Sequence, residues 1–142
     1  MTSNAFVAAI SFFIFGLGVF LAAGVRPLLL KGVEIQPEFI RSVLTSIFSR
    51  YNSVSLVLAV SCIVVQLLSS TSLSLMAATV GLSAMLALKL PIDSVIRKRE
   101  HAGQIRGFGT DGRKLDTLHR IVEGATIGVF LLALATLAIS VR

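Results

Sequence analysis

The stretch NSVSLVLAVSCIVVQLLSSTSLSLMAATVGLSAMLAL, residues 52–88, decides the fold of this chain. It contains no charged side chain, and one helix over its whole length would far exceed the roughly 30 Å hydrocarbon core of a bilayer. The uncharged tetrapeptide Ser69-Ser70-Thr71-Ser72 interrupts it near the middle, as a tight turn would. We therefore predict a hairpin of two transmembrane helices, over residues 52–70 and 72–90.

Two further apolar runs flank this hairpin. Residues 5–25 carry no charge, and in residues 120–141 the only charged side chains are Arg120 and Glu123, both near the start. Residues 1–4 lack the positive charge of a signal-peptide n-region, so the first run is interpreted as a membrane span. The chain has 142 residues, 55% hydrophobic and 14% charged, whereas soluble domains carry about a quarter charged residues. These features predict an all-α protein, a single membrane domain with a bundle of four transmembrane helices.

The segment between the first two spans is expected to hold a short amphipathic helix on the cytoplasmic side. Arg26-Pro27 is expected to end the first span, because proline disfavours helical geometry in the residue before it. Apolar residues then recur with helical spacing up to Arg50-Tyr51, a pair suited to the headgroup level. These apolar residues are Phe39, Ile40, Val43, Leu44, Ile47 and Phe48.

The basic residues are segregated along the sequence. With four spans, residues 26–51 and 89–120 lie on one side of the membrane, and they contain every one of the 13 lysines and arginines except Arg142. The positive-inside rule places both loops in the cytoplasm and both termini on the non-cytoplasmic side of a bacterial inner membrane or its equivalent. The net charge of +6 is thus a topology signal. We expect lipid and no nucleic acid as partners, since no aromatic interleaving or binding fold accompanies the charge.

The loop of residues 89–120 is expected to be interrupted rather than helical throughout. Its glycines break any long helix, and the third span is expected to close near Lys89 and Pro91, although its helix can run on toward Arg97. These glycines are Gly103, Gly107, Gly109 and Gly112.

Small residues four positions apart occur in every span, and such pairs let helix backbones approach in lipid. We interpret them as packing contacts within one bundle. The alternative is a seam between two copies of the chain, with Gly124 and Gly128 as its expected site. The pairs are Gly18 with Ala22, Ser55 with Ala59, Ala77 with Gly81, and Gly124 with Gly128.

Asp116, His119 and Glu123 share one helical face through their i, i+3, i+7 spacing. Carboxylate and imidazole groups are ligands for divalent metals, and His101 is a candidate fourth ligand. The alternative is a polar stripe at the membrane interface, with Asp116 stabilised near a helix N-terminus.

Glu123 lies about one turn inside the last span. An ionisable side chain in a span tends to be functional, which makes Glu123 a candidate for solute or ion handling. The alternative is a structural ion pair with Arg120, Arg26 or Lys89.

The first span is rich in aromatic rings, which could face a pigment or another lipophilic ligand or simply pack and contact lipid. No facing histidines for haem, no metalloprotease or nucleophile-elbow signature, and no phosphate-binding lysine loop is present. The sequence therefore predicts a non-enzymatic protein and identifies no cofactor. The rings belong to Phe6, Phe12, Phe13, Phe15 and Phe20.

Four short motifs lie in corresponding order along the chain. They are Phe15-Gly16 with Phe20 and residues 24–29, residues 47–51, residues 99–101, and Leu118-His119. Together they resemble the TMEM205-like (DUF4149) family of membrane proteins. The resemblance implies four helices and contributes no enzymatic chemistry.

We therefore expect a small non-enzymatic membrane protein that assists the transport or handling of a small solute or metal. The alternative is an accessory or structural subunit that packs on a larger membrane complex, including one that contains pigments.

Overall fold

The computed structural model describes residues 3–31 and 37–142, with the side chains of residues 31, 37, 38 and 41 outside that description. Helices account for nearly all of the described residues, and these residues contain no strand. The elements are α1 (Ser3–Val19), the π-helix η1 (Phe20–Val25), α2 (Arg26–Lys31), α3 (Pro37–Leu67), α4 (Leu73–His101) and α5 (Gly109–Ser140).

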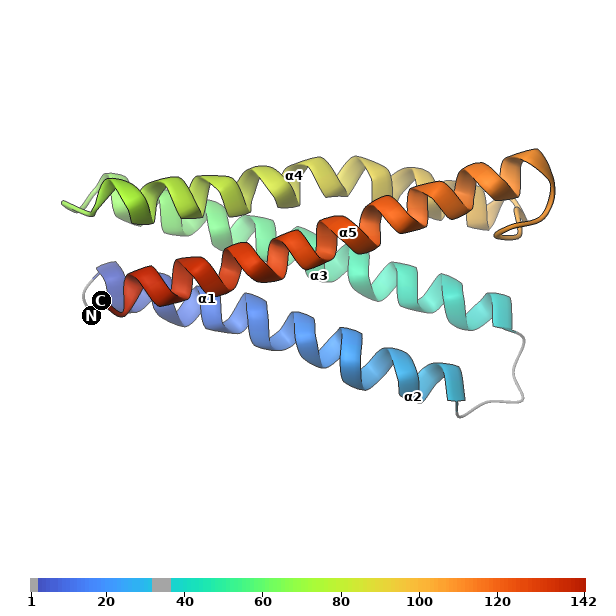
Figure 1. Cartoon of the computed structure of the whole chain (residues 1–142), viewed down its shortest axis with the longest axis horizontal. Helices are drawn as coiled ribbons and strands as arrows, with labels where there is room; N and C mark the ends of the chain where they lie inside the picture. Colours follow the sequence, from blue (N-terminus) through green and yellow to red (C-terminus); the bar gives the residue numbers. More distant parts are fainter. Residues whose placement is uncertain (1–2, 32–36) are drawn as a thin grey trace.

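The helices form an elongated bundle, which confirms the predicted all-α fold. The two chain ends and the α3–α4 turn lie at one end of the bundle, and the α4–α5 loop lies at the other (Figure 1). Among the described residues, four helices are long and apolar enough to cross a membrane. They cover Ser3–Leu30, Ser42–Leu67, Leu73–His101 and Gly109–Ser140.

The predicted hairpin is confirmed. α3 ends at Leu67 and α4 begins at Leu73, with the polar residues of the predicted turn between them. Ser72 caps α4, because its hydroxyl accepts a hydrogen bond from the backbone N–H of Leu75 at 3.4 Å. The turn sequence thus ends one helix and starts the next within a few residues.

The predicted separate amphipathic helix is wrong in one respect: it is continuous with the second span. No glycine or proline occurs in residues 38–67, so nothing interrupts α3 where the segment reaches the membrane. The headgroup position expected for Tyr51 is also wrong. Tyr51 is 5% exposed and donates a hydrogen bond from its hydroxyl to the Ile14 carbonyl at 2.6 Å.

The first span does not end at Arg26-Pro27, because a π-helical turn carries the chain past the proline. The Arg26 N–H donates to the Leu21 carbonyl, five residues back, where an α-helix would use the residue four back. The wider turn accommodates Pro27, which has no N–H and would clash with the carbonyl of the preceding turn. The helix then continues as α2 to Lys31.

The last two helices are longer than predicted at the end of the bundle opposite the termini. α4 runs to His101, with Pro91 inside it, and α5 begins at Gly109, well before the expected residue 120. Gly109 has a φ of 68°, which suits the connecting loop. Gly112 lies within α5, where a Cβ would collide with the Ile105 carbonyl, so this glycine allows the loop to pack on the helix.

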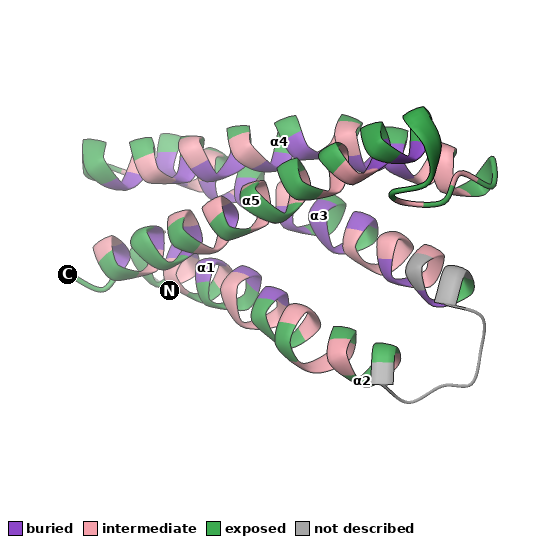
Figure 2. Ribbon diagram, turned by 45° about the vertical axis from the view of Figure 1, so that its right-hand side comes forward, coloured by how far each residue is buried: buried purple, intermediate pink, exposed green. Residues whose placement is uncertain are grey.

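The core lies along the bundle axis, and the outer surface is largely apolar. Buried residues face inward and exposed residues face outward along each helix (Figure 2). The Phe15 and Phe130 rings meet edge to face, with centroids 6.2 Å apart, and tie α1 to α5. The main buried cluster consists of Ile14, Tyr51, Ala59, Leu82, Leu86, Val129 and Ala133.

A hydrogen bond joins the two arms of the hairpin near the turn. Gln66 Nε2 donates to Thr79 Oγ1 at 2.8 Å, and both residues are 1% exposed. We expect Thr79→Val to lower the free energy of unfolding by about 1 kcal/mol, typical of one interhelical hydrogen bond in a membrane. Reversible unfolding in detergent micelles measures this loss of stability. Thr117→Val is the control, since the exposed Thr117 bonds only to its own helix; equal losses in both variants would contradict the interpretation.

Candidate functional site

A cavity of about 630 Å³ opens among the helices at the end of the bundle opposite the termini. This volume lies in the range of small-molecule sites. One part of its wall is apolar, with Leu44, Phe48, Ile96, Leu115, Val122 and Phe130. The other part carries ionisable groups, namely Arg26, Lys89, Asp93, Glu100, Arg106, His119 and Glu123.

Two buried ionisable side chains, Lys89 and Asp93, form the floor of this cavity, and the buried Asn52 bridges them without lining the cavity itself. Lys89 Nζ donates to Asn52 Oδ1 at 3.2 Å, and Asn52 Nδ2 donates to Asp93 Oδ2 at 2.5 Å. Lys89 is 1% exposed, Asp93 4% and Asn52 0%. Asn52 on α3 thus bridges an acid and a base that lie one turn apart on α4.

The depth of Lys89 in the membrane determines how much free energy its charge costs. Lys89 lies about 16 residues along α4 from Leu73, or about 24 Å at the helical rise. A hydrocarbon core of roughly 30 Å that starts near the α3–α4 turn therefore contains Lys89. Charged groups at such depth are costly and are generally paired or face a polar cavity. Lys89 is hydrogen-bonded to Asn52, and it also lines the cavity.

Sequence reasoning missed this floor. The sequence places Lys89 at the start of a charged loop and expects the third span to close near Pro91, although it allows the helix to run on toward Arg97. Since α4 continues through Pro91, Lys89 and Asp93 share a helical face. An acid four residues after a lysine, beside an asparagine in a neighbouring span, is the signal that could have revealed the site.

Glu100 and His119 contact each other in the wall of the cavity. His119 Nε2 lies 3.1 Å from Glu100 Oε1 and joins α5 to α4. The second carboxylate oxygen of Glu100 and the side-chain oxygen of Gln104 are buried and have no hydrogen-bond partner among the described residues. Solvent does not reach either oxygen, so both lie within the packed wall and not on the cavity surface.

Ion pairs occupy the rim of the cavity. Glu123 pairs with Arg26 at 3.3 Å and lies 3.9 Å from Arg106. Asp116 pairs with Arg106 at 2.6 Å and with Arg120 at 3.1 Å. These pairs link α2, the α4–α5 loop and α5. The Arg26 partner of Glu123 is one of the three that the sequence suggested.

The structure does not bring Asp116, His119 and Glu123 together as a ligand set. Asp116 and Glu123 are held by arginines, and His119 is held by Glu100. The candidate fourth ligand, His101, is exposed. Over residues 3–31 and 37–142, no three His, Cys, Asp or Glu side chains are grouped so that they could hold a metal ion.

The small residues predicted to pack helices fall into different environments. A Cβ on Gly18 would collide with Phe130, and one on Gly128 would press on Met85 at 3.1 Å. Gly124 is exposed, with nothing within 4 Å of the Cβ position. The other three lie as follows: Gly81 in ordinary contact with Leu132, Ala77 exposed on α4, and Ala22 in the cavity wall.

The aromatic rings of the first span do not gather around a common space. Phe12 is 64% exposed, Phe13 47% and Phe20 61%, on the outer surface of the bundle. Phe15 packs on Phe130 within the bundle. This distribution fits lipid contact and packing better than a pigment pocket.

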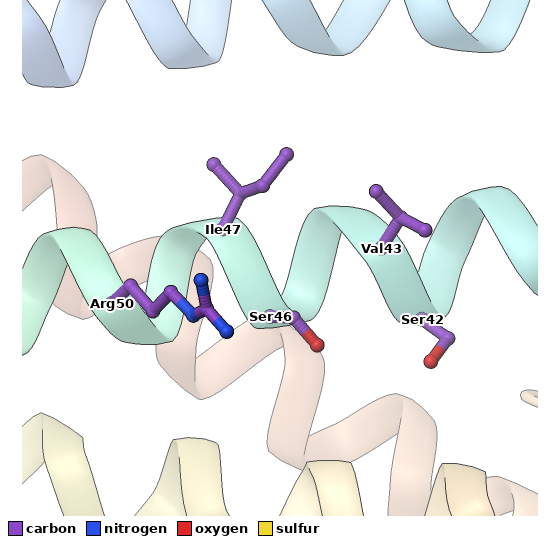
Figure 3. A pocket seen from close by; sticks show the side chains of 5 residues that line it. All are labelled: Ser42, Val43, Ser46, Ile47 and Arg50. Atoms are coloured by element: carbon purple, nitrogen blue, oxygen red, sulfur yellow. The ribbon is translucent and has the colours of Figure 1, made fainter.

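A second, smaller hollow of about 270 Å³ lies along α3. The polar groups of Ser42, Ser46 and Arg50 lie toward one side of the helix, and Val43 and Ile47 point to the other (Figure 3). All five lining residues come from one helix, so this hollow does not enclose a solute. The larger cavity is the candidate functional site.

No protein-family model matches the chain, and the searches of curated proteins and of solved structures found no match either. The fold itself shows the class of protein: a helical bundle with four helices suited to cross a membrane, within the part of the chain that is described.

Proposed function

We propose that this chain is a non-enzymatic, multi-pass membrane protein that binds a small polar solute in its cavity as a step in the transport or handling of that solute. The observation that carries the proposal is the cavity of about 630 Å³ whose floor holds the buried Lys89 and Asp93, bridged by Asn52. A binding site of this kind needs a concave volume, an apolar wall and a few polar groups, and the cavity has all three.

The energetics of the floor favour a binding role over a purely structural one. A charged side chain within a membrane helix costs up to about 2.5–3.5 kcal/mol on insertion scales, the value that applies at the helix centre. Apolar residues of similar volume would hold α3 and α4 together without this cost. Lys89 and Asp93 therefore suit a site where solute or water enters the bundle.

The direction of access follows from the charge distribution. Nearly all basic residues lie in the two segments at the cavity end of the bundle, so the positive-inside rule favours a cavity that opens to the cytoplasm. Both termini then lie on the non-cytoplasmic side of a bacterial inner membrane or its equivalent.

Cysteine labelling tests access to the cavity. Thr126 lines the cavity, and the natural Cys62 is 1% exposed. We expect the Thr126→Cys protein to react with a membrane-impermeant maleimide in inside-out vesicles and not in right-side-out vesicles, because water reaches the cavity only from the cytoplasm. The wild-type chain should remain unlabelled in both.

Gly124→Cys is the matched control. It lies two residues from Thr126 and about 3 Å nearer the cytoplasmic end, on the opposite face of α5, outside the cavity. We expect it to react more slowly than Thr126→Cys, since it faces lipid. Equal labelling of both positions, or labelling from the other side only, would contradict the proposal.

If the wild-type chain instead copurifies in mild detergent with a larger complex that seals the cavity, the accessory-subunit alternative holds.

A further inference from the structure

We infer that the mouth of the cavity is a gate, formed by the α4–α5 loop and α2, and that ion pairs of Arg106 and Glu123 hold this gate shut. The inference rests on the proposed function, because it assumes that the cavity admits a solute, and it adds how access to that site is controlled.

The α4–α5 loop, residues 102–108, forms one side of the cavity mouth. The loop lies at the end of the bundle opposite the chain termini (Figure 1), which is the end where the cavity opens. A solute that enters from this end must therefore pass the loop. Four loop residues line the cavity, namely Gly103, Gln104, Ile105 and Arg106.

The loop is held against α5 by a close backbone contact and by one arginine. The Gly107 N–H donates to the Gly112 carbonyl at 2.9 Å, and Arg106 pairs with Asp116 at 2.6 Å. A Cβ on Gly112 would collide with the Ile105 carbonyl, so the close contact requires glycine. The Arg106 and Asp116 side chains still contact water, and ion pairs of this kind contribute little to stability. Release of the loop from α5 is therefore a small step.

Glycines at both ends allow the loop to change direction. Gly103 has a φ of 77° and Gly109 a φ of 68°, which glycine adopts without steric cost. Nothing lies within 4 Å of the Cβ position of either residue, so the backbone has space there. Closing loops turn on a few such positions, which absorb the change in backbone dihedral angles.

α2 forms the other side of the mouth, and the π-helical turn that leads to it is loosely packed. Arg26 and Leu30 line the cavity. No residue of η1 is buried, whereas α1 has buried residues as far as Gly18. The packing of the first span thus changes where the π-helical turn begins. Such turns are frequent at functional sites, and this one is placed to act as the hinge of α2.

Glu123 on α5 connects the two sides of the gate. Its carboxylate pairs with Arg26 of α2 at 3.3 Å and lies 3.9 Å from Arg106 of the loop. Because one carboxylate approaches an arginine on each side, removing its charge weakens both sides at once. The ionisable residue that the sequence singles out in the last span then controls entry to the cavity.

The rate at which Thr126→Cys reacts with the membrane-impermeant maleimide in inside-out vesicles tests the gate. We expect Arg106→Gln and Glu123→Gln each to raise this rate by about two- to fivefold, as the loss of a weak ion pair increases the open population. Gly112→Ala should raise the rate at least as much, because its methyl group displaces the Ile105 carbonyl and with it the loop.

The directions of these three changes separate the gate from a local effect of charge on the thiol. Removing the Glu123 carboxylate favours the thiolate of the introduced cysteine, whereas removing the Arg106 guanidinium disfavours it. Charge alone would therefore accelerate labelling in one variant, slow it in the other and leave Gly112→Ala unchanged. An opened mouth accelerates labelling in all three.

Two variants outside the mouth are the controls. Gly124→Ala adds the same methyl group where nothing lies within 4 Å, and Asp111→Asn removes an exposed carboxylate that pairs with Lys114. Both should react at the rate of the parent Thr126→Cys protein. The natural Cys62, which is 1% exposed, reports on the fold and should stay unlabelled in each variant without the added cysteine.

Unchanged rates in Arg106→Gln and Gly112→Ala, or acceleration in Glu123→Gln alone, would overturn the inference and leave the solute cavity standing. Labelling of Thr126→Cys that appears only in the three gate variants supports the inference, since the gate is then shut in the resting protein. If Thr126→Cys is unlabelled in every protein, water does not reach the cavity and the proposed function fails as well.

Discussion

Asp93→Ala is expected to lower the free energy of unfolding by about 3 kcal/mol or more, the loss typical when one partner of a buried ionic network is removed. The variant removes the acidic neighbour of Lys89, which is 1% exposed and donates to Asn52, and it also removes the acceptor of the Asn52 amide N–H. Lys89 must then keep its charge in apolar surroundings or give up its proton. Both outcomes raise the free energy of the folded state.

A triple variant separates stability from function at this floor. Asn52→Leu, Lys89→Met and Asp93→Leu together remove every polar group of the network, so no orphaned partner remains. We expect its stability to lie within about 1 kcal/mol of the wild type or above it, because apolar replacement of a buried ionic network is often neutral or stabilising. It should nevertheless lose solute binding, since the floor of the cavity is then apolar.

Reversible unfolding in mixed detergent micelles measures both variants. Asp111→Ala, on the exposed first turn of α5, is the control and should change stability by less than about 0.5 kcal/mol. A loss in Asp93→Ala no larger than in this control would show that Lys89 and Asp93 are solvated independently. A triple variant as unstable as Asp93→Ala would show that the network is needed for folding.

The sequence predicts the architecture well because bilayer physics constrains it strongly. The length of residues 52–88 and the polar turn within them require two helices, and the structure has α3 and α4 there. Helix ends were harder to predict, because Pro27 and Pro91 can each lie inside a helix when the surrounding backbone adapts. At Pro27 that adaptation is the π-helical turn, which no local sequence rule specifies.

The site was partly predictable from the sequence. Glu123 was singled out as an ionisable group within a span, and it lies at the rim of the cavity with Arg26. The contact of Glu100 with His119 depends on how the α4–α5 loop folds back, and the bridge through Asn52 depends on how α3 packs against α4. Such contacts join residues far apart in the chain, so periodicity within one helix does not reveal them.

Gly18→Leu is expected to destabilise the bundle by about 2–3 kcal/mol, because it overpacks a site that has no free volume. A Cβ at this position already collides with the Phe130 ring and the Tyr51 hydroxyl. Tyr51 donates to the Ile14 carbonyl, so a larger residue also displaces a buried hydrogen bond between α3 and α1. Thermal unfolding in detergent measures the loss. Partial recovery of Gly18→Ala by Phe130→Leu in a double-mutant cycle would identify the ring as the obstacle.

Gly124→Leu is the matched comparison, since both glycines belong to small-residue pairs and the sequence does not distinguish them. Nothing lies within 4 Å of the Cβ position of Gly124, so the leucine has space and also favours the helix over glycine. We expect this variant to be as stable as the wild type or slightly more so. Equal destabilisation by both leucines would contradict the packing assigned to Gly18. If Gly124→Leu instead changes the mass of the detergent-solubilised particle measured by light scattering, the exposed face around Gly124 is a contact between two copies of the chain, as the alternative interpretation of the glycine pair requires.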